Sequence, residues 1–322
     1  MGARVFIDGQ EGTTGLSIRQ RLAERDDIEL VEIDERRRKH PAARRDCSRA
    51  ADVCVLCLPD EAAREAAAWA SEDGTRLLDA SSAHRTDPGW VYGLPELVEG
   101  QRERIADSRA VCVPGCYATG ALLLLRPLVD SGQLPASTPV GVFALSGYSG
   151  GGKSLISRWE NPANALLELP YSAPYALDRE HKHIPEIRHY SGLEKAPLFR
   201  PSVGPFRCGM RVEIGLHREA LGGAGGAALW ELLAERYAAE PFVEVAGFED
   251  SLPRYYETRF DPLRCNGTNR IELHVLPNPG GHMLLVALLD NLGKGAGGAA
   301  VQNLNLMLGV EEERGLGPSS AP

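Results

Sequence analysis

The stretch Ala110-Val111-Cys112-Val113-Pro114-Gly115-Cys116-Tyr117-Ala118-Thr119-Gly120 decides how we expect this chain to fold. A short apolar run ends at Pro-Gly, a cysteine follows at once, and an Ala/Leu-rich segment continues to Leu125. The pattern predicts a strand, a tight turn and a helix, with Cys116 on the turn. A thiol there meets the positive end of a helix dipole, which stabilises the thiolate, and the helix end offers free N–H groups to an anion. Cys116 is therefore a candidate nucleophile, and the alternative is a buried structural cysteine.

Composition narrows the class of protein. The chain has 322 residues, of which 43% are hydrophobic and 25% charged, and this length suggests two globular domains. A net charge of −9 argues against general nucleic-acid binding. No apolar run approaches the ~20 residues that span a bilayer, and the N-terminus reads as a strand rather than a signal peptide. Seven irregularly spaced cysteines fit reduced thiols, so we expect a cytoplasmic protein.

A glycine-rich turn follows the first predicted strand, which covers Arg4 to Asp8. It reads Gly9-Gln10-Glu11-Gly12-Thr13-Thr14-Gly15 and precedes a helical pattern. Glycines allow a tight turn and close backbone approach, and the helix N-terminus that follows can receive a phosphate. We predict that Gly9, Gly12, Thr13, Thr14 and Gly15 contact a dinucleotide. The alternative is a structural turn without a ligand.

The second predicted strand, 28–33, ends in Asp34-Glu35-Arg36-Arg37-Arg38-Lys39. An acidic residue at this place usually binds the ribose 2′-hydroxyl of NAD, whereas arginines accommodate the 2′-phosphate of NADP. The four consecutive basic residues favour NADP, with Arg36 and Arg37 as its expected contacts. A solvated basic turn is the alternative.

The next segments complete a parallel sheet. The apolar run 52–59 predicts a strand covered on both faces, so its Cys54 and Cys57 are expected in the core. A helix over 61–70 and a strand over 75–80 continue the alternation that is typical of a doubly wound α/β sheet. Ligands bind at the carboxyl ends of such strands, which makes Ser81 and Arg85 candidate substrate contacts. A surface salt bridge is the alternative for Arg85.

The second half of the chain changes character. Strands predicted over 140–145, 203–216, 271–276 and 283–289, with a helix over 230–239, indicate an α+β domain on a mixed or antiparallel sheet, which could pack on a second copy. The segment 164–175 is expected to be irregular, and the tail after Gly309 disordered. Gly147 to Ser154 has P-loop spacing, but we interpret it as a flexible loop whose Lys153 could hold an anion.

Two histidines, His181 and His183, are candidates for a general acid–base, with structural histidines as the alternative. Metal binding by this pair would need a third ligand that the sequence does not show, so we expect no metal site. The other six histidines, among them His217 and His282, are expected to be surface or structural residues. Cys112, inside its strand, is expected to be inert core.

Taken together, these residues resemble the N-acetyl-gamma-glutamyl-phosphate reductases, enzymes of arginine biosynthesis, and more closely the shorter of that family's two sequence types. The motifs that carry the resemblance run from residue 9 to residue 303. They are Gly9-x-x-Gly12-x-x-Gly15, Asp79-x-Ser81-x-Ala83-x-Arg85, Tyr92-Gly93-Leu94-Pro95-Glu96-Leu97, Pro114-Gly115-Cys116-Tyr117-Ala118-Thr119, His181-x-His183-x-Pro185-Glu186, and Asn291-Leu292-x-Lys294-Gly295-Ala296 with Gln302-Asn303.

The resemblance implies a Rossmann-like NADP-binding domain, 1–117 plus 290–322, and an inserted catalytic and dimerisation domain, 118–289. It implies a homo-oligomer, a dimer or a tetramer, that reduces N-acetyl-glutamyl 5-phosphate through a thioester on Cys116, with a histidine of the pair as acid–base. Asn291 is an expected cofactor contact. Lys182 stands where many longer members carry arginine, which loses a bidentate fork.

Two other readings remain open. The first is another acyl-phosphate reductase, such as an aspartate-semialdehyde dehydrogenase or a reductase of a carrier-bound substrate, in which only the pocket would differ. The second is a catalytically silent NADP(H) sensor, which would need neither Cys116 in that turn nor the histidine pair.

Overall fold

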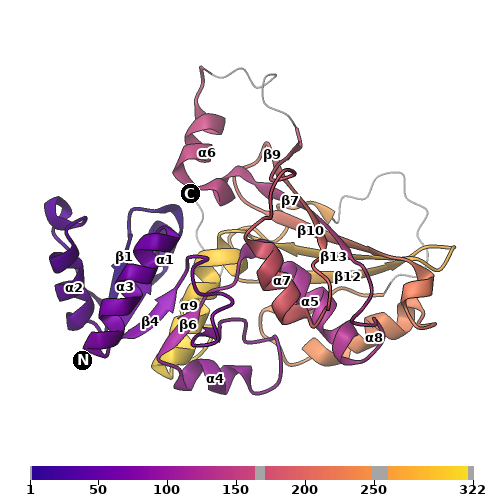
Figure 1. Cartoon of the computed structure of the whole chain (residues 1–322), viewed down its shortest axis with the longest axis horizontal. Helices are drawn as coiled ribbons and strands as arrows, with labels where there is room; N and C mark the ends of the chain where they lie inside the picture. Colours follow the sequence, from indigo (N-terminus) through magenta and orange to yellow (C-terminus); the bar gives the residue numbers. More distant parts are fainter. Residues whose placement is uncertain (1, 164–170, 249–259, 318–322) are drawn as a thin grey trace. The chain divides into compact units, whose positions relative to one another are not determined.

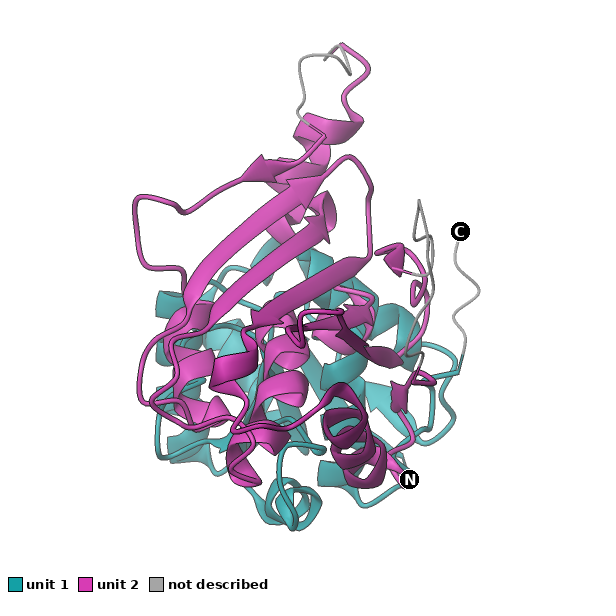
Figure 2. Ribbon diagram, turned by 90° about the vertical axis from the view of Figure 1, so that its right-hand side faces the viewer, with its two compact units in different colours: residues 1–114, 296–322 teal, residues 115–295 magenta. Residues whose placement is uncertain are grey.

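The computed structural model describes residues 2–163, 171–248 and 260–317. The chain divides into two compact units, 1–114 with 296–322 and 115–295, which Figure 2 colours separately. The sequence placed these boundaries after residues 117 and 289. Within the described ranges, every helix is too short or too polar to cross a membrane.

Unit 1 is built on a six-stranded sheet in which every pairing is parallel. The strand order is β2-β1-β3-β4-β6-β5, so the order reverses at β1, beside β3. Ligands of doubly wound sheets bind at such a reversal, at the carboxyl ends of the strands. The strands are β1 (Ala3–Asp8), β2 (Ile28–Leu30), β3 (Val53–Leu56), β4 (Arg76–Asp79), β5 (Val91–Tyr92) and β6 (Ala110–Cys112).

The helices of unit 1 come from both ends of the chain (Figure 1). They are α1 (Thr13–Leu22), α2 (Pro41–Ala50), α3 (Asp60–Asp73), α4 (Gln101–Asp107) and α9 (Gly298–Leu308). Helix α9 packs against α4, α1 and β4. A hydrogen bond of 2.8 Å from Asn303 Nδ2 to the Gly93 carbonyl ties α9 to the segment that follows β5.

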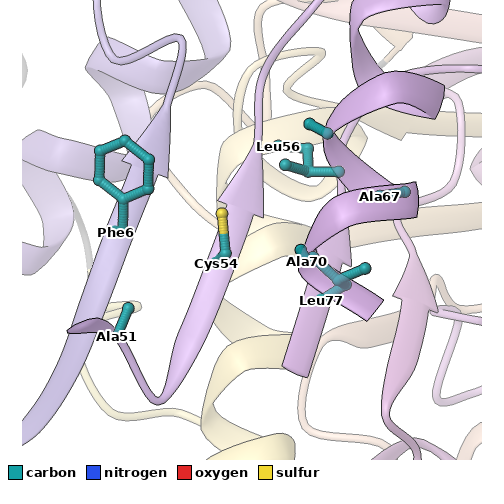
Figure 3. Close-up of a cluster of buried hydrophobic side chains, with 8 residues drawn as sticks. Phe6, Ala51, Cys54, Leu56, Ala67, Ala70 and Leu77 are labelled. Carbon is teal, nitrogen blue, oxygen red and sulfur yellow. The ribbon is translucent and has the colours of Figure 1, made fainter. Parts of the chain in front are cut away.

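One core of unit 1 shows why an alanine-rich helix suits this sheet (Figure 3). Phe6, Cys54, Leu56 and Leu77 lie on β1, β3 and β4 and are at most 1% exposed. The face of α3 that packs on them is made of alanines, 66, 67 and 70. These small side chains let the helix approach the strands closely, and burial of the larger groups contributes about 25 cal/mol per Å² of apolar surface.

Unit 2 is built on a seven-stranded mixed sheet with the order β11-β12-β13-β10-β7-β9-β8. The central run β12-β13-β10-β7 is antiparallel, whereas β7–β9 and β11–β12 pair in parallel. The strands are β7 (Gly141–Gly147), β8 (Ala173–Pro174), β9 (Leu198–Gly204), β10 (Met210–Leu216), β11 (Val243–Val245), β12 (Ile271–Pro277) and β13 (Met283–Leu289).

Four α-helices of unit 2 accompany this sheet in the described part of the chain: α5 (Cys116–Asp130), α6 (Gly152–Glu160), α7 (His183–Ser191) and α8 (Gly226–Tyr237). Helix α5 packs against β10 and β13 and also contacts α7 and α8. It lies so close to the sheet that a Cβ on Gly120 would come within 2.9 Å of Val212 Cγ2. The sheet therefore fixes the helix that begins at Cys116.

The predicted fold class, a doubly wound parallel sheet plus an α+β domain on a mixed sheet, is confirmed. Helices α2 and α4 were not predicted. The glycine run after β7 is not a flexible loop, because it forms a 3₁₀ turn, η2 (Tyr148–Gly151), followed directly by α6.

The predicted disorder after Gly309 is wrong for residues 310–317. Leu316 is only 5% exposed there, and Asn305 Nδ2 donates to the carbonyls of Glu312 and Arg314 at 2.9 and 2.8 Å. Buried apolar surface and satisfied carbonyls hold this segment to unit 1. Residues 318–322, and residues 164–170 of the predicted irregular segment, lie outside the described residues.

Candidate active site

Cys116 is the first residue of α5. Its N-cap, Gly115, is extended (φ −73°, ψ 144°) and makes no side-chain capping hydrogen bond, and the first turn of α5 contains no acidic residue. The first amides of a helix lack intrahelical partners, so they and the helix dipole act on the half-buried thiol. This is the environment that favours a thiolate.

Glu186 lies on α7, three residues after His183, and is 1% exposed. Its Oε1 accepts a 2.7 Å hydrogen bond from the Gly115 N–H, next to the candidate nucleophile. A hydrogen bond to a buried carboxylate is stronger than one between neutral groups, so it holds the start of α5 firmly. Glu186 belongs to the histidine motif quoted above, but no role was predicted for it. The spacing of three residues from His183, which places both on one helix face, is a signal that could have found it.

Gly295 packs directly against Cys116. It lies in a single π-helical turn, Gly293–Gly297. A Cβ on Gly295 would come within 2.7 Å of the Cys116 Cβ and 3.3 Å of its Cα. Only glycine fits there without displacing the cysteine, which explains the glycine in the motif Asn291-Leu292-x-Lys294-Gly295-Ala296.

The two predicted histidines lie together in an aromatic cluster. His183 is the first residue of α7 and is 4% exposed, and His181 lies just before that helix. Their ring centroids are 4.8 Å apart, and they lie 5.9 Å (His181) and 5.5 Å (His183) from the ring of Tyr117. Since Tyr117 follows Cys116 directly, the cluster lies beside the start of α5.

Hydrogen bonds define the tautomer of His181. Its Nδ1 accepts from the His183 backbone N–H at 3.2 Å, and its Nε2 lies 3.4 Å from the hydroxyl of Tyr175. That hydroxyl donates its hydrogen to the Tyr117 hydroxyl at 3.2 Å, so Nε2 must carry the hydrogen shared with Tyr175. Both ring nitrogens of His181 are therefore engaged within the protein.

Both tyrosines stay protonated under ordinary conditions. Burial raises the pKa of Tyr117 well above its usual value. Burial also raises the pKa of Tyr175 to about 12, although the hydrogen bond to Tyr117 lowers it and the neighbouring Cys116 adds to the rise. The phenols therefore remain hydrogen-bond donors at neutral pH.

The glycine loop after β7 is held by Asn291. The Oδ1 of Asn291 accepts from the Gly209 N–H at 2.8 Å, and its Nδ2 donates to Ser149 Oγ at 2.9 Å. This buried side chain, which we expected to contact the cofactor, thus braces the loop in unit 2. Lys153 is exposed, in the first turn of α6.

In unit 1, the predicted dinucleotide turn connects β1 to α1. Gly9 has a φ of +92°, and a Cβ there would lie 2.3 Å from the Cys57 carbonyl oxygen, so only glycine is tolerated. A Cβ on Gly15 would come within 2.5 Å of the Gly9 oxygen. Gly12 caps α1 without a side-chain hydrogen bond, and the helix begins with Thr13 and Thr14.

The buried Thr13 Oγ1 finds no hydrogen-bond partner in the described part of the chain. An uncapped helix start next to an unsatisfied hydroxyl can accept a phosphate group, so these residues fit a dinucleotide.

The basic residues after β2 lie on a short 3₁₀ turn, η1 (Glu35–Arg37), where Arg36 and Arg37 are exposed. Asp34 Oδ1 accepts a 2.8 Å hydrogen bond from the Arg36 N–H. One carboxylate oxygen of Asp34 is therefore committed to its own turn.

The candidate substrate residues of unit 1 follow β4. Both oxygens of Asp79 are used by Ser81, through its N–H and its hydroxyl at 2.8 Å each. The His84 ring stacks on Trp90, and its Nδ1 lies 2.6 Å from Asp79 Oδ2. Arg85 is buried and donates through Nε to the Val113 carbonyl at 3.0 Å, so it is not the surface salt bridge considered as its alternative.

Two family models match the chain. Residues 4–108 match the semialdehyde dehydrogenase NAD binding domain, and residues 116–291 match the semialdehyde dehydrogenase dimerisation domain. Unit 1 thus carries a nicotinamide-dinucleotide domain. Among solved structures, aspartate semialdehyde dehydrogenase II of Vibrio cholerae, complexed with ASA, superposes with a TM-score of 0.71 at 16% identity, covering 96% of this chain and 98% of that one. Aspartate semialdehyde dehydrogenase with NADP from Candida albicans gives 0.63 at 15% identity, with coverages of 96% and 99%.

Curated relatives are much more similar in sequence. N-acetyl-gamma-glutamyl-phosphate reductase of Brucella anthropi is 48% identical over 312 residues, covering 96% of this chain and 99% of the relative. The enzyme of the same name from Trichormus variabilis is 49% identical over 319 residues, with coverages of 97% and 99%. Identity at this level over nearly the whole length shows that the chain belongs to the N-acetyl-gamma-glutamyl-phosphate reductase family.

Proposed function

We propose that this protein reduces N-acetyl-glutamyl 5-phosphate to N-acetyl-glutamate 5-semialdehyde with NADPH, releasing phosphate, as the third step of arginine biosynthesis. The observation that carries the proposal is Cys116 at the uncapped start of α5, beside the cluster of His181 and His183. The names of relatives that are 48–49% identical support the substrate.

The reaction begins with Cys116. Its thiolate attacks the carbonyl carbon of the acyl phosphate, a C–S bond forms, and phosphate leaves with the electrons of the broken C–O bond. When bound, the reduced nicotinamide supplies the hydride that lowers the thioester to the oxidation level of an aldehyde. The oxyanion that develops on the substrate is protonated by a histidine, and collapse of the thiohemiacetal returns the thiolate. Backbone N–H groups at the start of α5 stabilise the oxyanion, a contribution of roughly 3 kcal/mol in such sites.

We assign proton transfer to His183 and the orienting role to His181. Both ring nitrogens of His181 are engaged, one by the His183 amide and one by Tyr175. Moving a proton through His181 would break one of these hydrogen bonds, each of which contributes about 1 kcal/mol. His183, on the helix that also carries Glu186, is fixed in relation to the start of α5.

We propose that unit 1 binds the cofactor and that Gly9, Gly12, Thr13, Thr14 and Gly15 hold its pyrophosphate. The uncapped start of α1 and the unsatisfied Thr13 hydroxyl support this assignment. The exposed Arg36 and Arg37 would bind a 2′-phosphate bidentately, whereas Asp34 is partly committed to its own turn, so we favour NADP over NAD.

The anionic groups of the substrate need cationic and hydroxyl side chains to bind them. We propose that Ser81 and Arg85 in unit 1 and Lys153 in unit 2 contact carboxylate or phosphate. Arg85 is buried in the segment that follows β4 and supplies a fixed positive charge there. Lys153 in the first turn of α6 adds a positive charge to a helix N-terminus.

We further propose that unit 2 provides the contacts of a homo-oligomer, a dimer or a tetramer, which the match to a dimerisation domain supports. The seven cysteines are all free, which supports the reducing cytoplasm as the compartment.

The decisive assay compares substrates. In the oxidative direction, phosphate-dependent NADP reduction should be faster with N-acetyl-glutamate semialdehyde than with aspartate semialdehyde. The opposite preference would replace the proposal by an aspartate-semialdehyde dehydrogenase activity.

Cys116→Ser should abolish turnover while NADPH still binds. Near-wild-type turnover by this variant would contradict a covalent intermediate.

Iodoacetamide at neutral pH should label Cys116 selectively among the seven cysteines, because the other thiols do not lie at the start of a helix. Uniform slow labelling would instead support a cofactor sensor without catalysis.

A further inference from the structure

The end of the seven-stranded sheet brings two histidines face to face. Strand β10 ends at Leu216 and β13 begins at Met283, and these two residues are paired across the antiparallel ladder. One step further out along both strands, His217 comes opposite His282. Their ring centroids are 4.8 Å apart with an interplanar angle of 71°.

A carboxylate completes the cluster. Glu219 lies on a 3₁₀ turn, η4 (Arg218–Ala220), whose N-cap is His217. One ligand atom from each of His217, Glu219 and His282 lies within 4.8 Å of the other two. A tetrahedral ion with bonds of about 2.0–2.1 Å holds its ligand atoms about 3.3 Å apart, so small side-chain rotations would close the site. The exposed His217 and Glu219 have the freedom to make them.

The backbone that carries His282 is already fixed. The Asn278 N–H donates to the His282 carbonyl at 3.0 Å, and the His282 N–H donates to Asn278 Oδ1 at 3.1 Å. Gly281, with a φ of +82°, lies so close to η4 that a Cβ would come within 3.0 Å of the Arg218 Cδ. The turn between β12 and β13 is therefore tied internally and packed on η4.

The Nδ1 atom of His282 is also able to act as a metal ligand. Its Nδ1 accepts a 3.1 Å hydrogen bond from the Arg218 N–H, which assigns a lone pair to that nitrogen. A lone pair is what a metal requires, and this one points towards the turn that carries Glu219. Coordination through Nδ1 would exchange the hydrogen bond for a metal–nitrogen bond.

We propose that His217, Glu219 and His282 form a binding site for a divalent transition-metal ion of the zinc type, with water completing the coordination. Two imidazoles and one carboxylate suit Zn²⁺, Co²⁺ or Ni²⁺, whereas Mg²⁺ and Ca²⁺ need mainly oxygen ligands. The bound ion joins the end of β10 to the β12–β13 turn. The site lies outside the groups assigned to catalysis, and the two histidines are 65 positions apart, so the sequence predicted no metal there.

Cobalt titration of the full chain tests the proposal, because the spectrum reports the ligands. Binding to this site gives visible ligand-field bands without the near-ultraviolet charge-transfer band of a cobalt–thiolate bond, which separates it from Cys116 and the other cysteines. We expect one such Co²⁺ per chain, displaced by Zn²⁺.

His217→Ala is the decisive variant, since this exposed residue can be truncated without opening the core. It should weaken Co²⁺ binding at least about tenfold, in line with loss of a ligand. Glu219→Gln should weaken it less, and His189→Ala, which removes an exposed histidine from the last turn of α7, should leave it unchanged. Equal affinities of wild type and His217→Ala, or a spectrum of thiolate type alone, would overturn the proposal.

Discussion

Gly295→Ala tests whether the backbone around Cys116 positions the nucleophile. The added Cβ would lie 2.7 Å from the Cys116 Cβ, whereas ordinary contacts begin at 3.4 Å. The cysteine or the π-helical turn must therefore move by about 0.7 Å, and displacements near 1 Å at a reacting group cost on the order of 10²-fold in rate. Overpacking of this kind also costs about 1–3 kcal/mol of stability.

We expect kcat to fall by about 30- to 100-fold, with a fall of a few degrees in Tm and slower iodoacetamide labelling of Cys116. The matched control is Gly215→Ala in β10, whose Cβ would meet no atom within 4 Å. The control should keep wild-type kcat and labelling rate. If Gly295→Ala also kept both, close packing of this turn would not be what positions the thiol.

Three further predictions concern the surroundings of Cys116. His183→Asn should lower kcat by about 10²–10⁴-fold and remove one limb of the pH–rate profile, whereas His181→Asn should cost less; equal, mild losses would contradict the assignment. Glu186→Ala leaves the Gly115 N–H without its acceptor and should lower the free energy of unfolding by about 1–3 kcal/mol in denaturant titration, while Glu186→Gln, which keeps an acceptor, should lose less; equal losses would speak against this role. The pKa of Tyr175 is raised by burial to about 12 from its usual 10.0, so the phenol favours folding below pH 10 and ceases to do so as the pH rises towards 12. Stability measured across that interval should therefore fall less steeply in Tyr175→Phe, and parallel curves would refute the shift.

The sequence predicted those parts of the fold that local patterns determine. The turn at Gly9 and Gly15 could be recognised because steric limits on glycine act over a few residues. Cys116 could be placed at a helix start because Pro114 and Gly115 end the strand and an apolar helical pattern follows. The parallel sheet followed from the alternation of strands with helices and from apolar runs such as 52–59, which are typical of a strand covered on both faces.

What the sequence did not predict depends on residues far apart in the chain. Glu186 reaches Gly115 across 71 positions, and Asn291 reaches Ser149 across 142. No local pattern gives such distances. The glycine run after β7 misled us because Gly152, at a φ of +70°, is the point where α6 begins. The tail misled us because its polar composition does not reveal the burial of Leu316 or the hydrogen bonds from Asn305 that hold it.

The return of the chain to unit 1 at α9 has a consequence for synthesis on the ribosome. Helix α9 packs against α1, α4 and β4, which belong to the first third of the chain, yet it is translated only after the whole of unit 2. Unit 2, which spans 115–295, can complete its sheet earlier, although it starts later. A nascent chain halted before residue 298 therefore carries an N-terminal sheet that still lacks one of its helices, and such partly covered sheets are prone to aggregate. The dinucleotide-binding unit is therefore the one whose folding must wait until unit 2 has been translated.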